Sequence, residues 1–322
     1  MTKPLDELVD TVRPTWQRFL DVFEPLRPDL YRYCRYLTRD AWDAEDLAQD
    51  AMARAFVNLG CSFHALPAPK AWLFRVASNL WIDRMRRRRL ADTRGDGAID
   101  QDAPAAPRAT REAAGTLIVQ LSPQERAAVV LKDVFELSLE EIAETLATSV
   151  GAVKAALHRG RGKLADPEPD APHVPAPGVL DEFCDAFNAR DLTRLTALLL
   201  DSAAVEIVGV VTEVGRDAAA GSLGGSLVPI TYEEGRGGIR PEHLDGYLGG
   251  LARCEVRQYR GQPIFVFWYA HIDREYCRCV MSVEVDGDKL VRLRNYFFTP
   301  EVIAEVCREL ELPYRTNGYR YW

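Results

Sequence analysis

The sequence lacks any apolar run long enough to cross a bilayer. Its longest apolar strand-like run, residues 264–270, is far shorter than the roughly 20 residues that a membrane helix needs. A cationic start followed by an apolar stretch, which would mark a signal peptide, is also missing. We therefore expect a cytoplasmic protein with no membrane partner.

Metal and phosphate sites also lack their usual sequence signals. The seven cysteines are scattered and odd in number, which argues against a disulfide framework. Cys277 and Cys279 alternate on one predicted strand, but no further cysteine or histidine stands at zinc-ligand spacing. Neither glycine-rich stretch, 221–227 or 235–239, is followed by Gly-Lys-Ser or Gly-Lys-Thr. We expect reduced buried thiols, no metal, no cofactor, and two surface loops at the glycine-rich stretches.

What this acidic chain, of net charge −8, does contain is a basic, tryptophan-rich segment over residues 70–90. Apolar residues at helical spacing predict a helix with one buried face. An aromatic ring, an amide and several cations recur along the opposite ridge, a combination that suits unpaired bases beside phosphates. The alternative is a solvated basic helix end with Trp72 or Trp81 in the core. The predicted core positions are Leu73, Val76, Ala77, Leu80 and Ile82 or Asp83, and the exposed ridge holds Trp72, Arg75, Asn79 and Arg86.

A sharper pattern lies in residues 121–164. Two short amphipathic helices are predicted there, and their spacing is typical of a helix-turn-helix, whose second helix enters the major groove of DNA. Ser149 is the expected cap of that second helix, and Ala147 stands where such turns often carry glycine. An ordinary helical hairpin with a basic edge is the alternative. Leu139, Ile142, Ala143, Leu146, Val153, Ala156 and Leu157 are expected inside, and Ala152, Lys154, Ala155, His158, Arg159 and Arg161 outside, unopposed by any carboxylate.

An acidic helix precedes both motifs, at residues 43–56 after the segment 30–40. Its spacing predicts Ala44, Leu47, Ala48, Ala51 and Ala55 on the core face and Asp46, Gln49 and Asp50 on the outer face. Acidic residues early in a helix also suit the helix dipole, which explains Asp43, Glu45 and Asp46 without any partner.

In this order the three motifs resemble the bacterial extracytoplasmic-function sigma factors, the small promoter-recognition subunits of RNA polymerase. The resemblance covers roughly the first half of the chain and implies RNA polymerase core and promoter DNA as partners. The outer face with Asp46, Gln49 and Asp50 would bind the clamp coiled coil of the largest polymerase subunit.

The resemblance also implies how promoter DNA is read. Residues 60–89 would melt and read the minus-ten element, with Trp72, Arg75 and Asn79 as candidates and Arg86 and Arg87 nearby. The helix at residues 149–163 would read the minus-thirty-five element. There the DNA-binding candidates are Ser149, Lys154, His158, Arg159 and Arg161.

Two polar segments divide the chain. Residues 91–107 are rich in Asp, Ala, Pro and Gly, and residues 166–178 are dense in proline. The predicted organisation is a polymerase- and minus-ten-binding domain at 1–90, a flexible acidic linker at 91–116, the helix-turn-helix domain at 117–166, a proline-rich linker at 167–178 and a third domain at 179–322.

The third domain has a mixed pattern. It predicts a helix pair broken at residues 188–191, strands at 205–211 and 264–270, and a hairpin around Asp286-Gly287. A final helix is expected to start at Pro300 with Thr299 as its cap. Residues 183–192 resemble the SnoaL-like, cone-shaped α+β fold. Cys277, Cys279, Met281, Val283 and Val285 are expected to share the core face of one strand.

The expected fold class is therefore multidomain, with two all-α sigma domains followed by an α+β SnoaL-like cone. Some SnoaL-like proteins are enzymes that use an Asp and a His, but nothing in this sequence shows that His271, Asp273, Glu206, Tyr269 or Glu275 converge. We expect no catalysis, and a C-terminal domain that modulates the sigma domains in cis, by docking on them or by sensing a small-molecule ligand. The alternative is a DNA-binding regulator fused to a SnoaL-like enzyme or ligand-sensing domain.

Overall fold

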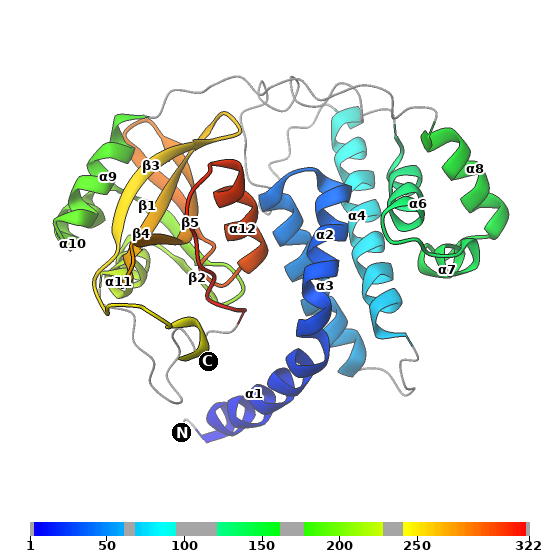
Figure 1. The fold of residues 1–322 in the computed structure, drawn as a ribbon, viewed down its shortest axis with the longest axis horizontal. Coiled ribbons are helices and arrows are strands. Elements are labelled where there is room, and N and C mark those ends of the chain that lie inside the picture. Colours follow the sequence, from blue (N-terminus) through cyan, green and yellow to red (C-terminus); the bar gives the residue numbers. More distant parts are fainter. Residues whose placement is uncertain (1–2, 61–67, 95–120, 162–176, 228–240, 320–322) are drawn as a thin grey trace. The chain divides into compact units, whose positions relative to one another are not determined.

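The chain folds into two compact units, Met1–Asp170 and Ala171–Trp322 (Figure 1). The structure, a computed structural model, describes residues 3–60, 68–94, 121–161, 177–227 and 241–319. Most of the two predicted linkers, and the glycine-rich stretch 235–239, lie outside the described residues. Where the first linker is described, helix continues to Arg94 instead of ending at residue 90.

In its described residues, the N-terminal unit consists of helices joined by short connections and contains no strand. A core of α2, α3 and α4 carries α1 on one side, and the trio α6, α7 and α8 packs against α2 and α4. In chain order the elements are α1 (Lys3–Phe23), the 3₁₀ turn η1 (Glu24–Leu26), α2 (Arg27–Thr38), α3 (Ala41–Gly60), α4 (Pro69–Arg94), α6 (Pro123–Asp133), α7 (Leu139–Thr145) and α8 (Val150–Arg161).

Helix α2 shows why this core forms. Leu30, Tyr33, Cys34 and Leu37 recur every three or four residues and are fully buried. The Tyr33 hydroxyl is satisfied inside by Ser78 Oγ at 2.7 Å, as a buried polar group requires. Helix α2 ends at Thr38, and the next residue, Arg39, caps it with a left-handed backbone, φ 65°.

Helix α1 was not expected from the sequence. It attaches through aromatic rings one turn apart: Phe19 stacks on Phe23 with centroids 4.5 Å apart, and Trp16 meets Phe56 of α3 edge-on at 4.9 Å. Phe19 and Phe23 are buried, so this stripe fixes α1 on the core.

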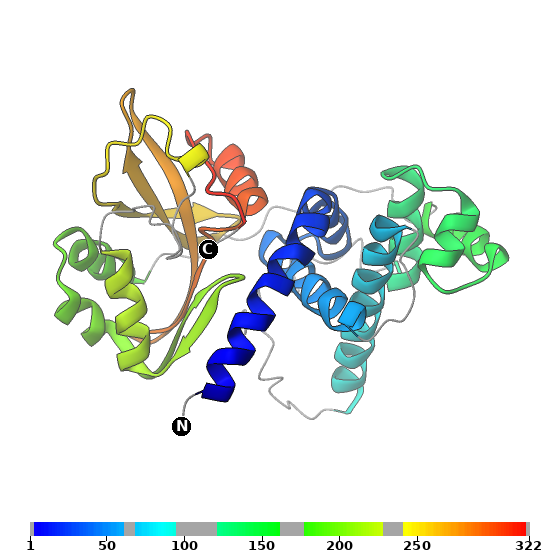
Figure 2. The ribbon, with the colours of Figure 1, turned by 90° about the horizontal axis from the view of Figure 1, so that it is seen from below.

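The C-terminal unit is a curled six-stranded sheet with helices on both faces (Figure 2). Helices α9, α10 and α11 cover one face and α12 the other. The strand order is β2-β1-β6-β5-β4-β3, with β1 and β6 parallel and the other neighbours antiparallel. The elements are α9 (Gly178–Asn188), α10 (Leu192–Leu198), β1 (Leu199–Ile207), β2 (Val211–Val214), α11 (Arg216–Ser226), η3 (Pro241–His243), β3 (Arg253–Tyr259), β4 (Gln262–Ala270), β5 (Glu275–Asp286), β6 (Lys289–Asn295) and α12 (Pro300–Glu309).

Aromatic rings join α9 to the sheet. Phe183 stacks on Phe265 with centroids 4.4 Å apart, and Phe187 meets Phe267 edge-on at 5.1 Å. All four side chains are buried in one apolar cluster that also takes in β1, β5 and β6. The predicted architecture, helices followed by a curved sheet, is confirmed, and so is the helix break after Asn188.

Several local predictions were wrong. The run 205–211 is not one strand, because Gly209 has φ 79° and turns the chain between β1 and β2. The stretch 221–227 is not a loop, because residues 216–226 form α11 and bury Ala219, Ala220 and Leu223. Tertiary packing has here outweighed the weak helix propensity of glycine.

The side chain of Cys277 does not share the core face of β5 with that of Cys279. The register shifts between Phe267 and Trp268, so Cys279 pairs with Phe267 while Cys277 pairs with Trp268. This bulge turns Cys277 toward α12, where its thiol contacts Cys307. Cys279 and Met281 lie in the core cluster as predicted, with Val283 and Val285 packed against it.

Two turn details also differ. The β5–β6 pairing brings Asp286 opposite Lys289, so the two turn residues are Gly287 and Asp288, one position later than predicted. Gly287 has φ 59°. Thr299 occupies the N-cap position of α12, but its hydroxyl donates to the Tyr296 carbonyl at 2.8 Å instead of capping the helix.

Candidate polymerase and nucleic-acid interfaces

Helix α3 carries the predicted polymerase-binding face. Its predicted core positions Ala44, Leu47, Ala48, Ala51 and Ala55 are all fully buried. On the other side, Asp46 and Gln49 are half-buried and Asp50 is exposed. Asp50 forms a 3.0 Å ion pair with Arg84 of α4, so α4 takes part in shaping this face.

Sequence reasoning missed the role of Glu45. Its side chain is fully buried and pairs with Arg27 of α2, and it also accepts a 2.7 Å hydrogen bond from Gln49. Glu45 is therefore a structural residue that fixes α3 on α2 and orients Gln49. In the sequence, this role was indicated only by the position of Glu45, a charged residue on a mostly apolar face of the helix.

Helix α3 begins at a carboxylate cap. Asp40 Oδ1 accepts from the backbone N–H groups of Trp42 and Asp43, both at 2.9 Å. Burial and the neighbouring Asp43 raise the pKa of this carboxyl to about 6, although the cap hydrogen bonds and Arg35 oppose that shift.

Helix α4 buries a wider stripe than predicted. Leu73, Val76 and Ala77 are buried as expected, but Phe74, Ser78 and Trp81 are buried as well. Leu80 and Ile82 are only half-buried, and Asp83 is exposed and pairs with Arg86. The helix packs on α2 and α3 and also on the α6–α7 region, and these several neighbours account for the additional buried positions.

The predicted DNA-facing ridge of α4 is only partly open. Asn79, Arg86 and Arg87 are exposed. Trp72 is half-buried against Phe23, with ring centroids 6.0 Å apart. Arg75 donates from Nε to the Glu144 carbonyl of α7 at 2.9 Å, so its guanidinium is engaged inside the protein.

The helix-turn-helix has the packing that its sequence predicts. Ile142, Ala143, Leu146, Val153, Ala156 and Leu157 are buried, and Leu139 is half-buried. Capping boxes start α6 at Ser122 and α7 at Ser138. Ser149 Oγ accepts from the Ala152 N–H at 3.2 Å, which confirms it as the cap of α8. Ala147 has φ 48° in the turn, the left-handed region that favours glycine.

Helix α8 presents the expected outer face. Lys154, His158 and Arg159 are exposed, while the side chain of Arg161 lies outside the described residues. The prediction that no carboxylate opposes this face was wrong. Arg159 Nε pairs at 2.7 Å with Glu125, a buried residue of α6. Because the two residues are 34 positions apart, the sequence pattern of α8 alone gave no sign of this pair.

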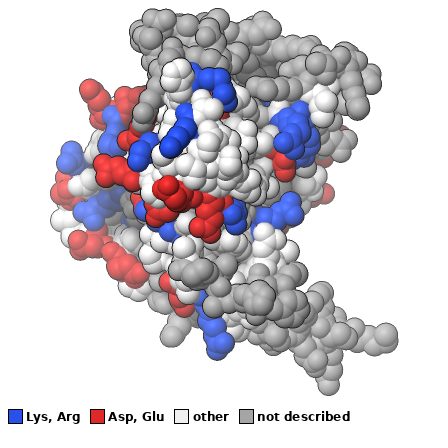
Figure 3. Space-filling view, turned by 90° about the vertical axis from the view of Figure 1, so that its right-hand side faces the viewer, with Lys and Arg blue, Asp and Glu red and all other residues white. Residues whose placement is uncertain are grey.

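The charge on this side of the unit is mixed. Figure 3 views the molecule from the side that holds α7 and α8, and blue and red areas are interspersed there with uncharged surface. Glu140, Glu141 and Glu144 of α7 are exposed beside the basic residues of α8. A hydrogen bond from the Ser138 backbone lowers the pKa of Glu141, which keeps it ionised. Among the described side chains, the basic residues of α8 therefore share this side of the unit with acidic ones.

In the C-terminal unit the candidate acid and base residues do not come together. Glu206 pairs with Arg294 at 2.8 Å, Glu275 with Arg253 at 2.8 Å, and Asp273 accepts from the Tyr276 hydroxyl at 2.6 Å. His271 is buried, with Nδ1 3.2 Å from the Asp245 carbonyl. Among the described residues, no two of these candidates form an acid–base pair.

A buried arginine organises this end of the fold. Arg278 is fully buried and donates to Asn317 Oδ1 at 2.9 Å and to the carbonyls of His243 and Thr316. Its Nη1 lies 3.4 Å from His271 Nε2. Burial lowers the pKa of Arg278 to about 10 and that of His271 below its usual value. These contacts hold the C-terminal tail against β5.

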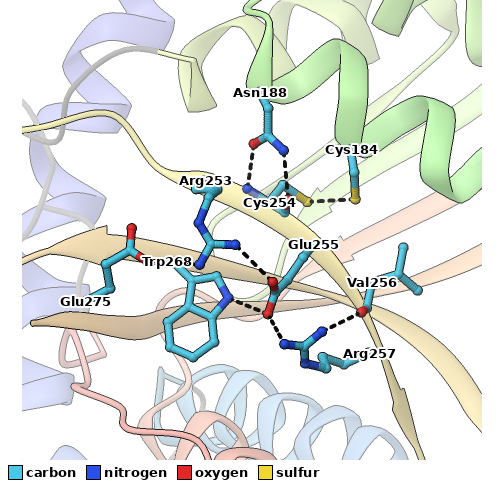
Figure 4. Close-up of polar contacts among 9 residues, drawn as sticks. All are labelled: Cys184, Asn188, Arg253, Cys254, Glu255, Val256, Arg257, Trp268 and Glu275. Atoms are coloured by element: carbon cyan, nitrogen blue, oxygen red, sulfur yellow. Dashed lines mark hydrogen bonds and ion pairs between the residues drawn. The ribbon is translucent and has the colours of Figure 1, made fainter.

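The edge strand β3 carries a closed ion network (Figure 4). Glu255 accepts from Trp268 Nε1 at 2.8 Å and pairs with Arg253 at 2.9 Å and Arg257 at 2.6 Å. On the opposite face of β3, the side-chain amide of Asn188 accepts a hydrogen bond from the Cys254 backbone N–H and donates one to the Cys254 carbonyl. The sulfur of Cys254 lies 3.5 Å from that of Cys184. Burial and Cys184 raise the pKa of Cys254 well above its usual value. Charged residues on an edge strand oppose pairing with other sheets.

The described residues contain neither a candidate metal site nor a candidate membrane helix. No cluster of three or more His, Cys, Asp or Glu side chains there could hold a metal ion. None of the helices in those residues combines the length and apolar character needed to span a membrane.

Comparison with known proteins matches both halves of the N-terminal unit. Residues 22–91 match the family model for sigma-70 region 2, and residues 111–164 match that for sigma-70 region 4. One similar solved structure is that of the extracytoplasmic function sigma factor SigJ of Mycobacterium tuberculosis. The match spans 86% of this chain and 95% of SigJ, with 22% sequence identity and a TM-score of 0.31.

Two curated relatives are similar over part of the chain. The ECF RNA polymerase sigma factor SigG of Mycobacterium tuberculosis is 29% identical over 221 residues, which are 57% of this chain and 60% of that protein. The ECF RNA polymerase sigma factor SigW of Bacillus subtilis is 35% identical over 166 residues, which are 45% of this chain and 86% of SigW. On this identity and coverage, the chain belongs to the extracytoplasmic-function (ECF) RNA polymerase sigma factors.

Proposed function

We propose that this sigma factor attaches to core RNA polymerase in the cytoplasm through α3, opens the minus-ten element with α4 and reads the minus-thirty-five element with α8. The arrangement of α8 supports this proposal best. Val153, Ala156 and Leu157 face inward, and Lys154 and His158 face outward beside Arg159. A helix presented in this way fits the major groove, where cations reach base edges and phosphates.

The polymerase contact uses the outer face of α3. Asp46, Gln49 and Asp50 lie opposite the buried alanine stripe of that helix. Two neighbouring basic residues shape this face, since Arg27 holds Glu45 beside Gln49 and Arg84 holds Asp50. The side chains are thereby ordered before binding, which reduces the entropic cost of association.

The minus-ten contact uses the exposed part of α4. Asn79 offers an amide for base edges, and Arg86 and Arg87 offer cations for phosphates. Trp72 and Arg75 complete the proposed site as a stacking surface and a cation. Arg75 must first leave the Glu144 carbonyl to do so.

The C-terminal unit acts in our proposal as a non-catalytic regulator in cis. Its possible acid and base residues are each engaged elsewhere, Glu206 with Arg294, Glu275 with Arg253 and Asp273 with Tyr276. The regulatory input is then docking of this unit or binding of a small molecule to it.

A test of the DNA contacts needs core polymerase and promoter DNA selected with the intact protein. Lys154→Ala on α8 should weaken binding of the selected minus-thirty-five duplex and lower the slope of affinity against salt by about one unit. The matched control is Lys289→Ala, which removes a lysine from the C-terminal unit. Equal binding and equal salt slopes for both variants would overturn the assignment of α8.

The proposed minus-ten contact is tested separately, by measuring how far the promoter opens. Asn79→Ala should leave duplex binding at the minus-thirty-five element intact and reduce opening of the start site, measured as permanganate reactivity of unpaired thymines. Full opening by this variant would remove Asn79 from the proposed site.

A further inference from the structure

Two cysteines of the C-terminal unit lie in contact between helix α9 and the edge strand β3. The sulfur of Cys184 in α9 is 3.5 Å from that of Cys254 in β3, and both side chains are buried. A disulfide has about 2 Å between its sulfurs, so an approach of roughly 1.5 Å would join them. The two residues are 70 positions apart in the sequence, so only the fold brings them together.

The backbone around this contact is held in a fixed register. Asn188, one turn after Cys184 in α9, accepts from the Cys254 N–H at 2.8 Å and donates to the Cys254 carbonyl at 2.9 Å (Figure 4). Arg190, just beyond α9, donates to the Ala252 carbonyl. Because these hydrogen bonds hold the start of β3 on the end of α9, the two sulfurs stay side by side without a covalent bond.

Access distinguishes this pair from other thiols of the unit. Cys184 is 8% exposed, whereas Cys277 and Cys307, which contact each other beside α12, are fully buried. A small oxidant therefore reaches Cys184 more readily. Burial and the neighbouring Cys184 raise the pKa of Cys254 well above its usual value, so Cys254 stays protonated until its partner has reacted.

We propose that Cys184 and Cys254 form a redox site, which hydrogen peroxide converts to a disulfide. The Cys184 sulfur attacks one peroxide oxygen and the O–O bond breaks. The other oxygen leaves as water with the Cys184 proton, and a sulfenic acid remains on Cys184. The Cys254 sulfur then attacks the Cys184 sulfur, the S–O bond breaks, and a second water leaves with the Cys254 proton. Two thiols are thereby oxidised and one peroxide is reduced to two waters.

The disulfide fixes α9 to the edge of the sheet. Phe183 and Phe187 of this helix already pack on Phe265 and Phe267 of β4, and the new bond prevents α9 from moving away from them. A cross-link between residues so distant in sequence also restricts the unfolded chain strongly. Its consequence for initiation rests on the regulation in cis proposed above, because a locked C-terminal unit should modulate the sigma half differently.

Peptide mapping tests the redox site without polymerase or promoter. The intact reduced chain is exposed to hydrogen peroxide, and its remaining thiols are then alkylated under denaturing conditions. Digestion should yield a linked pair of peptides that contain Cys184 and Cys254, and dithiothreitol should separate them. The oxidised chain should also unfold several degrees higher than the reduced one. Cys307→Ala removes a thiol beside α12 and should leave the link unchanged. Absence of the link in the intact chain overturns the proposal, whether or not any variant folds.

A trapped intermediate separates a redox site from two thiols that only pack together. In Cys254→Ala the sulfenic acid on Cys184 has no thiol to attack it, so dimedone should label Cys184 after peroxide treatment. In Cys184→Ala, Cys254 should stay unlabelled. Labelling of Cys254 in the second variant, with none of Cys184 in the first, would overturn the assigned order of the two steps.

Transcription tests the consequence for the sigma half. The chain is treated with peroxide, and catalase removes the excess before core polymerase is added. Initiation by the intact chain should change by about twofold or more, and initiation by Cys184→Ala should not respond. A link that forms without changing initiation overturns the coupling to the sigma half. If a chain that ends at Pro167 initiates like the untreated intact chain, the proposed regulation in cis fails, and peptide mapping still decides the redox site.

Discussion

At the scale of single residues, partners distant in sequence decide what a charged side chain can do. Arg159 has the position of a DNA-reading residue, and its Nε is already held by Glu125. Glu125 also accepts from the Ser122 backbone at 3.0 Å in the capping box of α6. The pair leaves the terminal nitrogens of Arg159 available in a fixed orientation, so we expect Glu125 to position this arginine.

Glu125→Gln should lower affinity for the selected minus-thirty-five duplex about fivefold, because a neutral amide orients the guanidinium less strongly. Combined with Arg159→Gln it should cause little additional loss, which a double-mutant cycle in a DNA-binding assay measures. The control Ser122→Ala removes the cap hydroxyl and should lower stability by about 1 kcal/mol without changing DNA selectivity. Additive losses from Glu125 and Arg159 would argue against positioning.

The turn of the helix-turn-helix stores backbone strain at Ala147, whose φ is 48° and whose side chain is exposed. Ala147→Gly should raise the free energy of unfolding by about 1 kcal/mol, since glycine adopts this conformation without a Cβ clash. Urea unfolding of the N-terminal unit measures the change. A loss of stability would mean that the turn has another conformation.

Asp40 gives the N-terminal unit a defined response to pH. Its folded pKa, about 6, lies above the usual value of 3.8, so the folded unit holds this proton more tightly than the unfolded chain. The unfolding free energy should therefore fall as pH rises from about 4 to about 6, by up to about 3 kcal/mol. Asp40→Asn retains a side-chain oxygen that can cap α3 and removes the carboxyl group that titrates. Unfolding curves at several pH values should show a flatter profile for this variant and greater stability at pH 7.

At the scale of elements, patterns local in sequence were predictable and patterns set by packing were not. The alanine stripe of α3 and the inward face of α8 follow from helical spacing. Trp81 is buried because α4 packs on α6 and α7 as well as on α2 and α3, which its own sequence pattern does not show. The bulge that turns Cys277 away from Cys279 depends on the register with β4.

Helix α11 offers a direct test of such a packing effect. Gly221 lies on its exposed side, and a Cβ there would meet nothing within 4 Å. Gly221→Ala should stabilise the C-terminal unit by about 1 kcal/mol, as expected for a helix interior. Gly224→Ala is the comparison, because its Cβ would approach Leu192 Cδ2 at 3.5 Å and should gain less. Destabilisation by Gly221→Ala, measured by thermal unfolding, would contradict the helix.

At the scale of the whole molecule, the sequence predicted the family and the order of the motifs, but not how the two halves of the N-terminal unit meet. The contacts of Phe135 with Tyr33 and Phe74 join residues about 60 to 100 positions apart and follow no periodicity. The same holds for the candidate site. Asn79 and Lys154 are exposed as expected, whereas the engagement of Arg75 by Glu144 required the structure.

The C-terminal unit accounts for nearly half of the chain and lies beyond both sigma family matches, which end at residues 91 and 164. In our account it regulates the sigma half in cis. Removing it should change how strongly initiation proceeds, while the start site should stay the same, since α4 and α8 select it.

The most direct test is in vitro transcription with core polymerase on selected promoter DNA, comparing the intact chain with one that ends at Pro167. The account predicts that both initiate at one discrete start site and differ in strength, and the sign of the difference tells whether the C-terminal unit restrains or assists. If both forms fold and bind core but neither initiates at a discrete site, the central claim is wrong.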